Sequence, residues 1–114
     1  RILIGVPASP FVQAGATAPP KRVVQTLHQA FVDQEILEIR YKREDGGTSA
    51  RQIEPHYLLL KYPIWYVVAL DHLRQGPRIF RCDRMVSGKL TGAHFRLLPK
   101  QAFEPSLADD DLSL

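Results

Sequence analysis

The sequence predicts a small, mainly β domain (α+β), a barrel or rolled sheet preceded by a single helix. Three observations support this prediction. One stretch near the N-terminus repeats its apolar residues at helical spacing. Five short apolar or alternating segments follow, with turn residues about every 8–12 positions. Strands and helices do not alternate, which argues against a doubly wound fold, and 114 residues are enough for only one domain.

The helix is predicted for residues 21–34, where Val24, Leu27 and Phe31 recur at helical spacing. Residues 1–19 precede it as an approach segment or linker. Its first residues could add one short strand, and prolines and a glycine punctuate the rest.

The five predicted strands cover residues 37–42, 50–60, 64–70, 78–84 and 85–91. The first alternates apolar and charged side chains, as a half-buried strand does, whereas the third is continuously apolar and fits a strand buried on both faces. Turn residues at 45–47 and at 75–77 separate neighbouring strands. Pro55 predicts an edge, a bulge or a bend in the second strand, and residues 94–98 could add a short final strand.

Charge is distributed unevenly along the chain. Lys and Arg number 15 and Asp and Glu number 12, which gives a net charge of +3. Four of the acidic residues lie after residue 103, so residues 1–103 carry 15 basic and eight acidic residues, a net charge of +7. The domain, expected over residues 20–99, is therefore basic, which favours polyanions such as nucleic acids or nucleotides as partners. Residues 100–114 are expected to form an acidic, disordered tail.

Several kinds of chemistry lack their sequence signature. No phosphate loop and no dinucleotide-binding glycine motif is present, so no cofactor is expected. The four histidines lack metal-ligand spacing, so no metal site is expected either. His28 is expected at the apolar boundary of the helix, and His56 and His94 at the surface. The single cysteine, Cys82, forbids an internal disulfide, fits a reducing compartment and is interpreted as a small buried hydrophobe.

Arginine and aromatic side chains concentrate on the third and fourth predicted strands. Alternation places Arg78, Phe80, Cys82 and Arg84 on one face of the fourth strand, and Ile79, Arg81 and Asp83 on the other. Guanidinium groups bind phosphate through paired hydrogen bonds, and aromatic faces stack on bases. This pattern suits an anionic, planar ligand such as a nucleotide or single-stranded nucleic acid. The alternative is a solvated charged hairpin, in which Asp71 and Asp83 neutralise two of the arginines.

Four short motifs in this region resemble the WYL domain family. They are Ile53-Glu54-Pro55, Trp65-Tyr66-Val67-Val68-Ala69, His72-Leu73-Arg74 and Arg78-Ile79-Phe80-Arg81-Cys82-Asp83-Arg84-Met85. The resemblance covers roughly residues 21–98. The sequence departs from the family pattern at Val67 and Cys82, which replace leucines, and at Asp71, where a small or polar residue is usual. It implies a Sm-like, SH3-type five-stranded β-barrel.

The resemblance also implies a function without catalysis. WYL domains are usually the C-terminal sensor part of bacterial, cytoplasmic transcriptional regulators, whose N-terminal helix-turn-helix domain binds promoter DNA. Their proposed role is to bind a nucleotide-like or single-stranded nucleic acid ligand. The family's polar and basic positions correspond here to Tyr66, His72, Arg74, Arg78, Arg81 and Arg84, with Asp83 and Asp71 as supporting ion-pair partners. A homodimer is expected, because regulators of paired half-sites are usually dimers.

Two other classes of function remain open. The chain could be a structural or oligomerisation module that uses its basic hairpin for protein contacts, or a small hydrolase that uses His72 with Asp71 or Asp83. Convergence of the arginines on a concave surface would favour ligand binding over protein contacts. A hydrolase would need a nucleophile or a metal within hydrogen-bond reach of His72.

Overall fold

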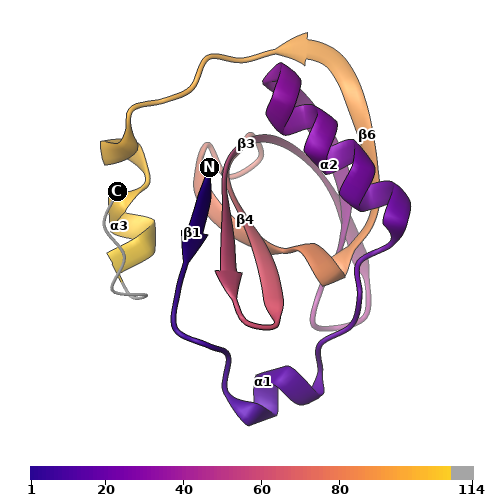
Figure 1. The fold of residues 1–114 in the computed structure, drawn as a ribbon. Helices are drawn as coiled ribbons and strands as arrows, with labels where there is room; N and C mark the ends of the chain where they lie inside the picture. Colours follow the sequence, from indigo (N-terminus) through magenta and orange to yellow (C-terminus); the bar gives the residue numbers. More distant parts are fainter. Residues whose placement is uncertain (109–114) are drawn as a thin grey trace.

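The computed structural model describes residues 1–108, which form a curled sheet with one long helix and several short helical turns (Figure 1). In chain order the elements are β1 (Ile2–Ile4), α1 (Pro10–Ala14), α2 (Lys21–Asp33), β2 (Glu35–Lys42), β3 (Thr48–Lys61), β4 (Ile64–Asp71), β5 (Gly76–Arg81), η1 (Cys82–Arg84), β6 (Met85–His94), η2 (Lys100–Ala102) and α3 (Glu104–Leu107).

The helix is confirmed over Lys21–Asp33, and its buried stripe consists of Val23, Leu27 and Ala30. Val24, expected in that stripe, is 48% exposed. The helix ends at Gln34, which takes a left-handed backbone conformation with φ 49° and leads directly into β2. Such a residue closes a helix by turning the chain away from its axis.

The strands are hydrogen-bonded in the order β5-β4-β3-β2-β6, and all of these neighbours are antiparallel. The long β3 pairs with β2 through its first half and with β4 through its second half. Strand β1 lies parallel to the second half of β3, with Ile2 opposite Leu58. The register of β3 and β4 shifts between Pro55 and Tyr57, which is the bulge or bend that the proline predicted.

The sheet is open, so the expectation of a closed barrel is wrong. Among the described residues, β5 and β6, the strands at the two ends of this order, are not hydrogen-bonded to each other. The predicted strand over residues 78–84 ends at Arg81, because the chain then enters the 3₁₀ turn η1, where the Met85 N–H bonds to the Cys82 carbonyl. The short final strand expected at 94–98 is also absent from the structure, since β6 runs only to His94.

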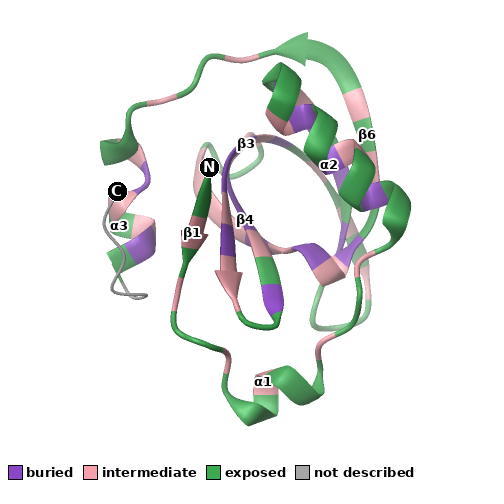
Figure 2. Ribbon diagram, viewed as in Figure 1, coloured by how far each residue is buried: buried purple, intermediate pink, exposed green. Residues whose placement is uncertain are grey.

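Two apolar clusters lie on opposite faces of the sheet, and Figure 2 shows the buried positions that build them. The inner cluster lies beneath α2 and includes Leu37, Ile39, Ile53, Val67 and Phe80. The outer cluster includes Leu59 and Val68 of the sheet together with Phe103 and Leu107 from the C-terminal turns. We use "inner face" and "outer face" for these two sides of the sheet.

The segment expected to form a disordered tail instead contains η2 and α3 over residues 100–107. Phe103 and Leu107 are fully buried against the outer face. Their spacing of four residues puts both on one side of a single turn, which covers apolar strand residues that would otherwise face water. The acidic run from Asp109 to Asp111 lies outside the described residues.

His56 is buried, with 1% of its surface exposed, so its predicted surface position is wrong. Its Nδ1 lies 2.8 Å from the carbonyl of Glu54, and its Nε2 accepts a hydrogen bond from the Leu98 N–H at 2.9 Å. Its ring also lies 4.4 Å from that of Phe103. Burial lowers the pKa of His56, which matches a neutral ring that donates from Nδ1. The register shift next to Pro55 is what breaks strand alternation at this residue.

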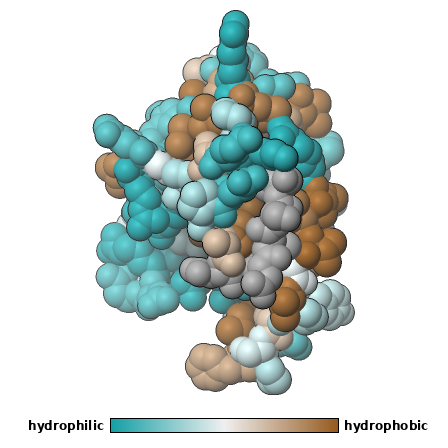
Figure 3. Space-filling model, turned by 90° about the vertical axis from the view of Figure 1, so that its left-hand side faces the viewer, coloured by the Kyte–Doolittle hydropathy of each residue, from teal (hydrophilic) through white to brown (hydrophobic). Residues whose placement is uncertain are grey.

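Helix α1, at the bottom of Figure 1, protrudes from the rest of the fold, and Figure 3 shows apolar side chains exposed at this end. Phe11 within it is 89% exposed. His94 is exposed, as expected, and His28 is exposed on the helix. No helix in residues 1–108 has the length and hydropathy required to cross a membrane.

Candidate anion-binding site

The site is built around Asp71, a fully buried carboxylate at the end of β4. Its Oδ2 accepts a hydrogen bond from Nη1 of Arg51 at 2.5 Å, and its Oδ1 accepts one from the Leu73 N–H at 3.1 Å. Arg51 can reach it because Asp71 is paired in the sheet with Ile53, two residues further along β3. A buried carboxylate requires such partners, since an unpaired charge in the interior costs several kcal/mol.

Arg78 approaches the same carboxylate from β5. Its Nη1 lies 3.9 Å from Oδ2 of Asp71, too far for a hydrogen bond. The guanidinium stacks over aromatic rings instead, 4.8 Å from the centroid of Phe80 and 5.7 Å from that of Tyr41. The aromatic faces hold the side chain in place and leave its donors unsaturated.

Two arginines, Arg51 and Arg78, therefore lie near one carboxylate, and the charge of a third, Arg74, acts on Arg78. Burial lowers the pKa of the Arg78 guanidinium, and the positive charges of Arg51 and Arg74 lower it further, against the opposing effects of Tyr41 and Asp71. The buried Nε of Arg51 has no hydrogen-bond partner among the described residues. We refer to Arg51, Arg74 and Arg78 as the inner arginine cluster. Its excess of positive charge is what an incoming anion would neutralise.

Tyr41 connects the inner arginine cluster to the next arginines along the chain. Its hydroxyl oxygen accepts a hydrogen bond from the backbone N–H of Arg81 at 2.9 Å. Burial raises the pKa of Tyr41, although this hydrogen bond and the charges of Arg84, Arg78 and Arg81 oppose the rise. Arg84 is only half-buried, and its nearest carboxylate is that of the exposed Glu44, 4.0 Å away.

Arg81 is paired with a neighbouring carboxylate through two hydrogen bonds. Its Nε and Nη2 donate to the two oxygens of Asp83 at 2.9 and 2.7 Å, and Asp83 also accepts from the Thr17 N–H at 3.1 Å. Burial alone would raise the pKa of Asp83, but these hydrogen bonds outweigh it and hold the pKa below its usual value. The same pair raises the pKa of Arg81. Asp83 thus forms the ion pair that was predicted to orient an arginine.

Tyr66 and His72 lie on the outer face. The Nζ of Lys61 is 5.9 Å from the centroid of the Tyr66 ring. His72 Nε2 lies 2.7 Å from Oε2 of Glu54, so its partner is neither Asp71 nor Asp83. The acid–base pairs considered for a hydrolase are therefore not formed.

The six predicted ligand residues do not form one patch. Cross-strand pairing places Arg78 opposite Ala69 on the inner face, and Arg81 opposite Tyr66 on the outer face. Arg74 acts electrostatically on Arg78, and Arg84 acts on the same Tyr41 phenol that Arg78 does. The structure therefore places Arg78 near Asp71, with the charge of Arg74 acting on it, and puts Arg81 and Tyr66 on the opposite face of the sheet; Arg84, like Arg81, acts on Tyr41.

Arg51 is an important residue of the site that the sequence analysis did not single out. Only 17% of its side chain is exposed. A signal existed in the sequence: pairing the strands on either side of the 45–47 turn puts Arg51 opposite Ile39, whose side chain is fully buried. A charged residue at an inward position of a strand needs a buried partner, and Asp71 provides it.

Comparison with known proteins gives the family. The WYL domain family matches residues 22–90, and the chain therefore belongs to that family. Among solved structures, it is similar to the Proteasome accessory factor B/C (PafBC) of Arthrobacter aurescens, with 25% sequence identity and a TM-score of 0.59. That similarity covers 69% of this chain and 13% of PafBC, so the chain spans only a small part of its relative's length.

Proposed function

We propose that this WYL domain is the ligand-sensing part of a bacterial, cytoplasmic transcriptional regulator and binds a nucleotide-like or single-stranded nucleic acid ligand. The observation that carries this proposal is the inner arginine cluster, in which Arg51 and Arg78 flank the single carboxylate of Asp71 and Arg74 adds a third positive charge that acts on Arg78. Family membership supports the regulatory role, and the convergence of the cluster favours ligand binding over a surface of dispersed charges.

The members of the cluster are suited to different tasks. Arg51 is committed to Asp71 by a short hydrogen bond and is mostly buried, so we assign it a positioning role. Arg78 is 29% exposed and lacks a close carboxylate, so its donors are available to a phosphate. Two further arginines would add positive charge around the site. They are Arg74, which is exposed in the turn after β4, and Arg84. Tyr66, His72 and Arg81 would then belong to a separate surface on the outer face.

The proposal is tested by fluorescence anisotropy with short, labelled, single-stranded DNA, and with RNA and free nucleotides as competitors. Replacing both Arg74 and Arg78 by Gln should weaken binding about a hundredfold, because each hydrogen bond to a charged group is worth roughly 1.5–3 kcal/mol. The matched control replaces the exposed Arg40 and Arg43 by Gln and removes the same charge from the first hairpin. Equal losses in the two double variants would show diffuse electrostatics and would favour the basic surface as a protein-contact module.

Salt dependence gives a second measure of the same contact. Neutralising phosphates releases counterions, so the logarithm of affinity should fall with the logarithm of salt concentration by about 0.7 per phosphate for single strands. The double Arg74/Arg78 variant should show a shallower slope than the wild type. Affinity that is independent of salt would contradict phosphate contacts as the main source of binding.

A sensor must also transmit its occupancy, which requires different ligand affinities in two states of the regulator. We propose that this domain transmits its ligand occupancy to a helix-turn-helix domain that binds promoter DNA. We also propose that the regulator acts as a homodimer. Sedimentation of the chain with and without the labelled DNA tests the second part. A monomer under both conditions would contradict a dimer formed by this domain.

A further inference from the structure

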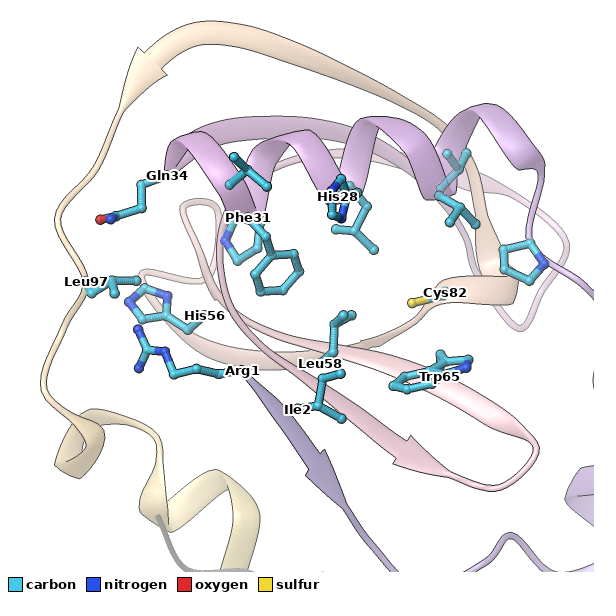
Figure 4. A pocket seen from close by; sticks show the side chains of 16 residues that line it. Arg1, Ile2, His28, Phe31, Gln34, His56, Leu58, Trp65, Cys82 and Leu97 are labelled. Carbon is cyan, nitrogen blue, oxygen red and sulfur yellow. The ribbon is translucent and has the colours of Figure 1, made fainter.

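A cavity of about 560 Å³ lies between α2 and the inner face of the sheet (Figure 4). Figure 4 shows Phe31 and His28 approaching it from the helix, and Leu58 and Trp65 from the strands below. The inner arginine cluster contributes none of the residues that line it. The cavity is therefore a site separate from the one proposed to bind anions.

The walls of this cavity are mainly apolar, and its polar groups lie at the edge. Gln34 and His28 are exposed on or just beyond α2, and Arg1 lies at the same end of the cavity as Gln34 in Figure 4. Both ring nitrogens of His56 already have hydrogen-bond partners. The Cys82 thiol borders the cavity too, and burial raises its pKa to about 12, so it is uncharged at neutral pH. No charged side chain stands in the middle of the cavity to attract an ion.

We propose that this cavity binds a small, uncharged, ring-containing apolar molecule with a hydrogen-bonding group at one end. Its volume falls within the range of about 300–1,000 Å³ that is typical of small-molecule sites. Phe31 and Trp65 provide aromatic faces from opposite walls. Val24 and Trp65 are 48% and 37% exposed although both are apolar, and a bound ligand would remove their surface from water.

The depth of the cavity favours a small molecule over another protein surface. Val23 and Leu27 form part of its lining, and only 3% and 5% of their surfaces are exposed. A partner surface that covered only the rim at Val24 and Trp65 would leave these inner residues without contact. A compact ring system can contact both, which gains more apolar contact for its size.

The probe for this site is N-phenyl-1-naphthylamine, an uncharged aromatic compound whose fluorescence increases in an apolar environment. Trp65 is the only tryptophan in the chain and lines the cavity, so energy transfer from Trp65 reports binding there without any substitution. Saturable one-to-one binding with quenching of Trp65 emission is expected. Non-saturating fluorescence, or an increase without quenching of Trp65, would overturn the proposal.

Substitution of Val24 by Phe should fill part of the cavity and weaken probe binding about tenfold. The matched control is Val86→Phe, because Val86 is 51% exposed, lies on β6 and does not line the cavity. The control should bind the probe within about twofold of the wild type. Equal weakening of both variants, each with a cooperative thermal transition, would contradict the site.

Two further measurements separate this proposal from its alternatives. Probe binding should be unaffected by salt and by Arg78→Gln, so it can succeed even where the proposed binding of nucleic acid fails. Sedimentation of the wild type in the presence of probe tests for an interface between copies. A dimer that the probe or Val24→Phe dissociates would identify the cavity as a protein interface and would overturn the assignment of a small ligand.

Discussion

Two arginines only three residues apart on β5 have opposite electrostatic surroundings. On the inner face, Arg78 shares the carboxylate of Asp71 with Arg51, which holds it at 2.5 Å, while Arg78 remains 3.9 Å away. On the outer side, Arg81 forms two hydrogen bonds with the carboxylate of Asp83, which also accepts one from the Thr17 N–H. The pKa of Arg78 is lowered and that of Arg81 is raised. The comparison indicates that the carboxylate groups near each arginine, more than the number of arginines, determine which guanidinium group is available to a ligand.

The largest expected effect concerns the carboxylate that organises the inner arginine cluster. Asp71→Ala should destabilise the fold by about 3–5 kcal/mol, because it leaves the mostly buried Arg51 without its partner. Urea unfolding measures this loss. Adding Arg51→Met to that variant should recover part of the stability, since no unpaired charge then remains. Losses that simply add in the double variant would mean that the two groups do not interact.

A smaller loss of stability is expected on the outer side. Asp83→Asn should cost about 2 kcal/mol, because it weakens the paired hydrogen bonds from Arg81. Asp45→Asn is the matched control, since Asp45 also accepts from an arginine and from a backbone N–H but is 67% exposed. Its urea midpoint should barely change. An equal shift in both variants would remove the distinction between a buried and an exposed pair.

The same variant makes a prediction about pH. The pKa of Asp83 is lowered on folding, so its contribution to stability is complete above the ordinary Asp value of 3.8 and is lost as the pH falls through the lowered value. The difference in unfolding free energy between the wild type and Asp83→Asn should therefore shrink at acid pH. Urea titrations from neutral to strongly acid pH check this. A difference that grows on acidification would contradict the ion pair.

Tyr41 lies between the two regions and should separate stability from binding. Tyr41→Phe removes the acceptor for the Arg81 N–H and should cost about 1 kcal/mol. The ring under Arg78 is kept, so affinity for single-stranded DNA should stay within about twofold of the wild type. Loss of binding without loss of stability would place the Tyr41 hydroxyl in the ligand site.

The smallest expected effect is that of Arg84→Gln. Arg84 is half-buried, its Nη1 lies 4.0 Å from the exposed Glu44, and it acts on Asp83 through its charge. We therefore expect it to act through the general field around the site. Its loss should weaken DNA binding about two- to threefold at low salt and less at high salt. Anisotropy titrations at two salt concentrations measure this, and a loss as large as that of Arg78→Gln would extend the site to η1.

Periodicity was sufficient to predict the helix and the five strands that follow it, since each buries one or both faces. It could not predict where β5 ends, because no glycine or proline separates Arg81 from the turn η1 that follows. Periodicity also did not predict that His56 is buried, because its burial depends on the register shift after Pro55. The burial of Phe103 and Leu107 depends on a distant partner, the outer face of the sheet, and a single helical turn carries too little local signal.

The candidate site was predicted in its composition more than in its arrangement. Arg78, Arg74, Arg84 and Asp71 were recognised from their type and from the family motifs, and the structure places Arg78 near Asp71 and within electrostatic range of Arg74. The separation of Arg81 from this group follows from strand pairing, and the role of Arg51 depends on the register of a neighbouring hairpin. Which carboxylate each arginine binds is a matter of three-dimensional packing, and residue type alone does not define it.

The most direct test compares Arg78→Gln with Arg81→Gln in binding labelled single-stranded DNA at one fixed, low salt concentration. The two variants remove the same charge from the same strand, so differences arise only from their surroundings. Arg78→Gln should weaken binding at least about tenfold and Arg81→Gln about twofold, although Arg81→Gln should lower the unfolding midpoint more. A larger loss of binding for Arg81→Gln, in variants that both unfold cooperatively, would contradict the assignment of the anion site to the inner arginine cluster.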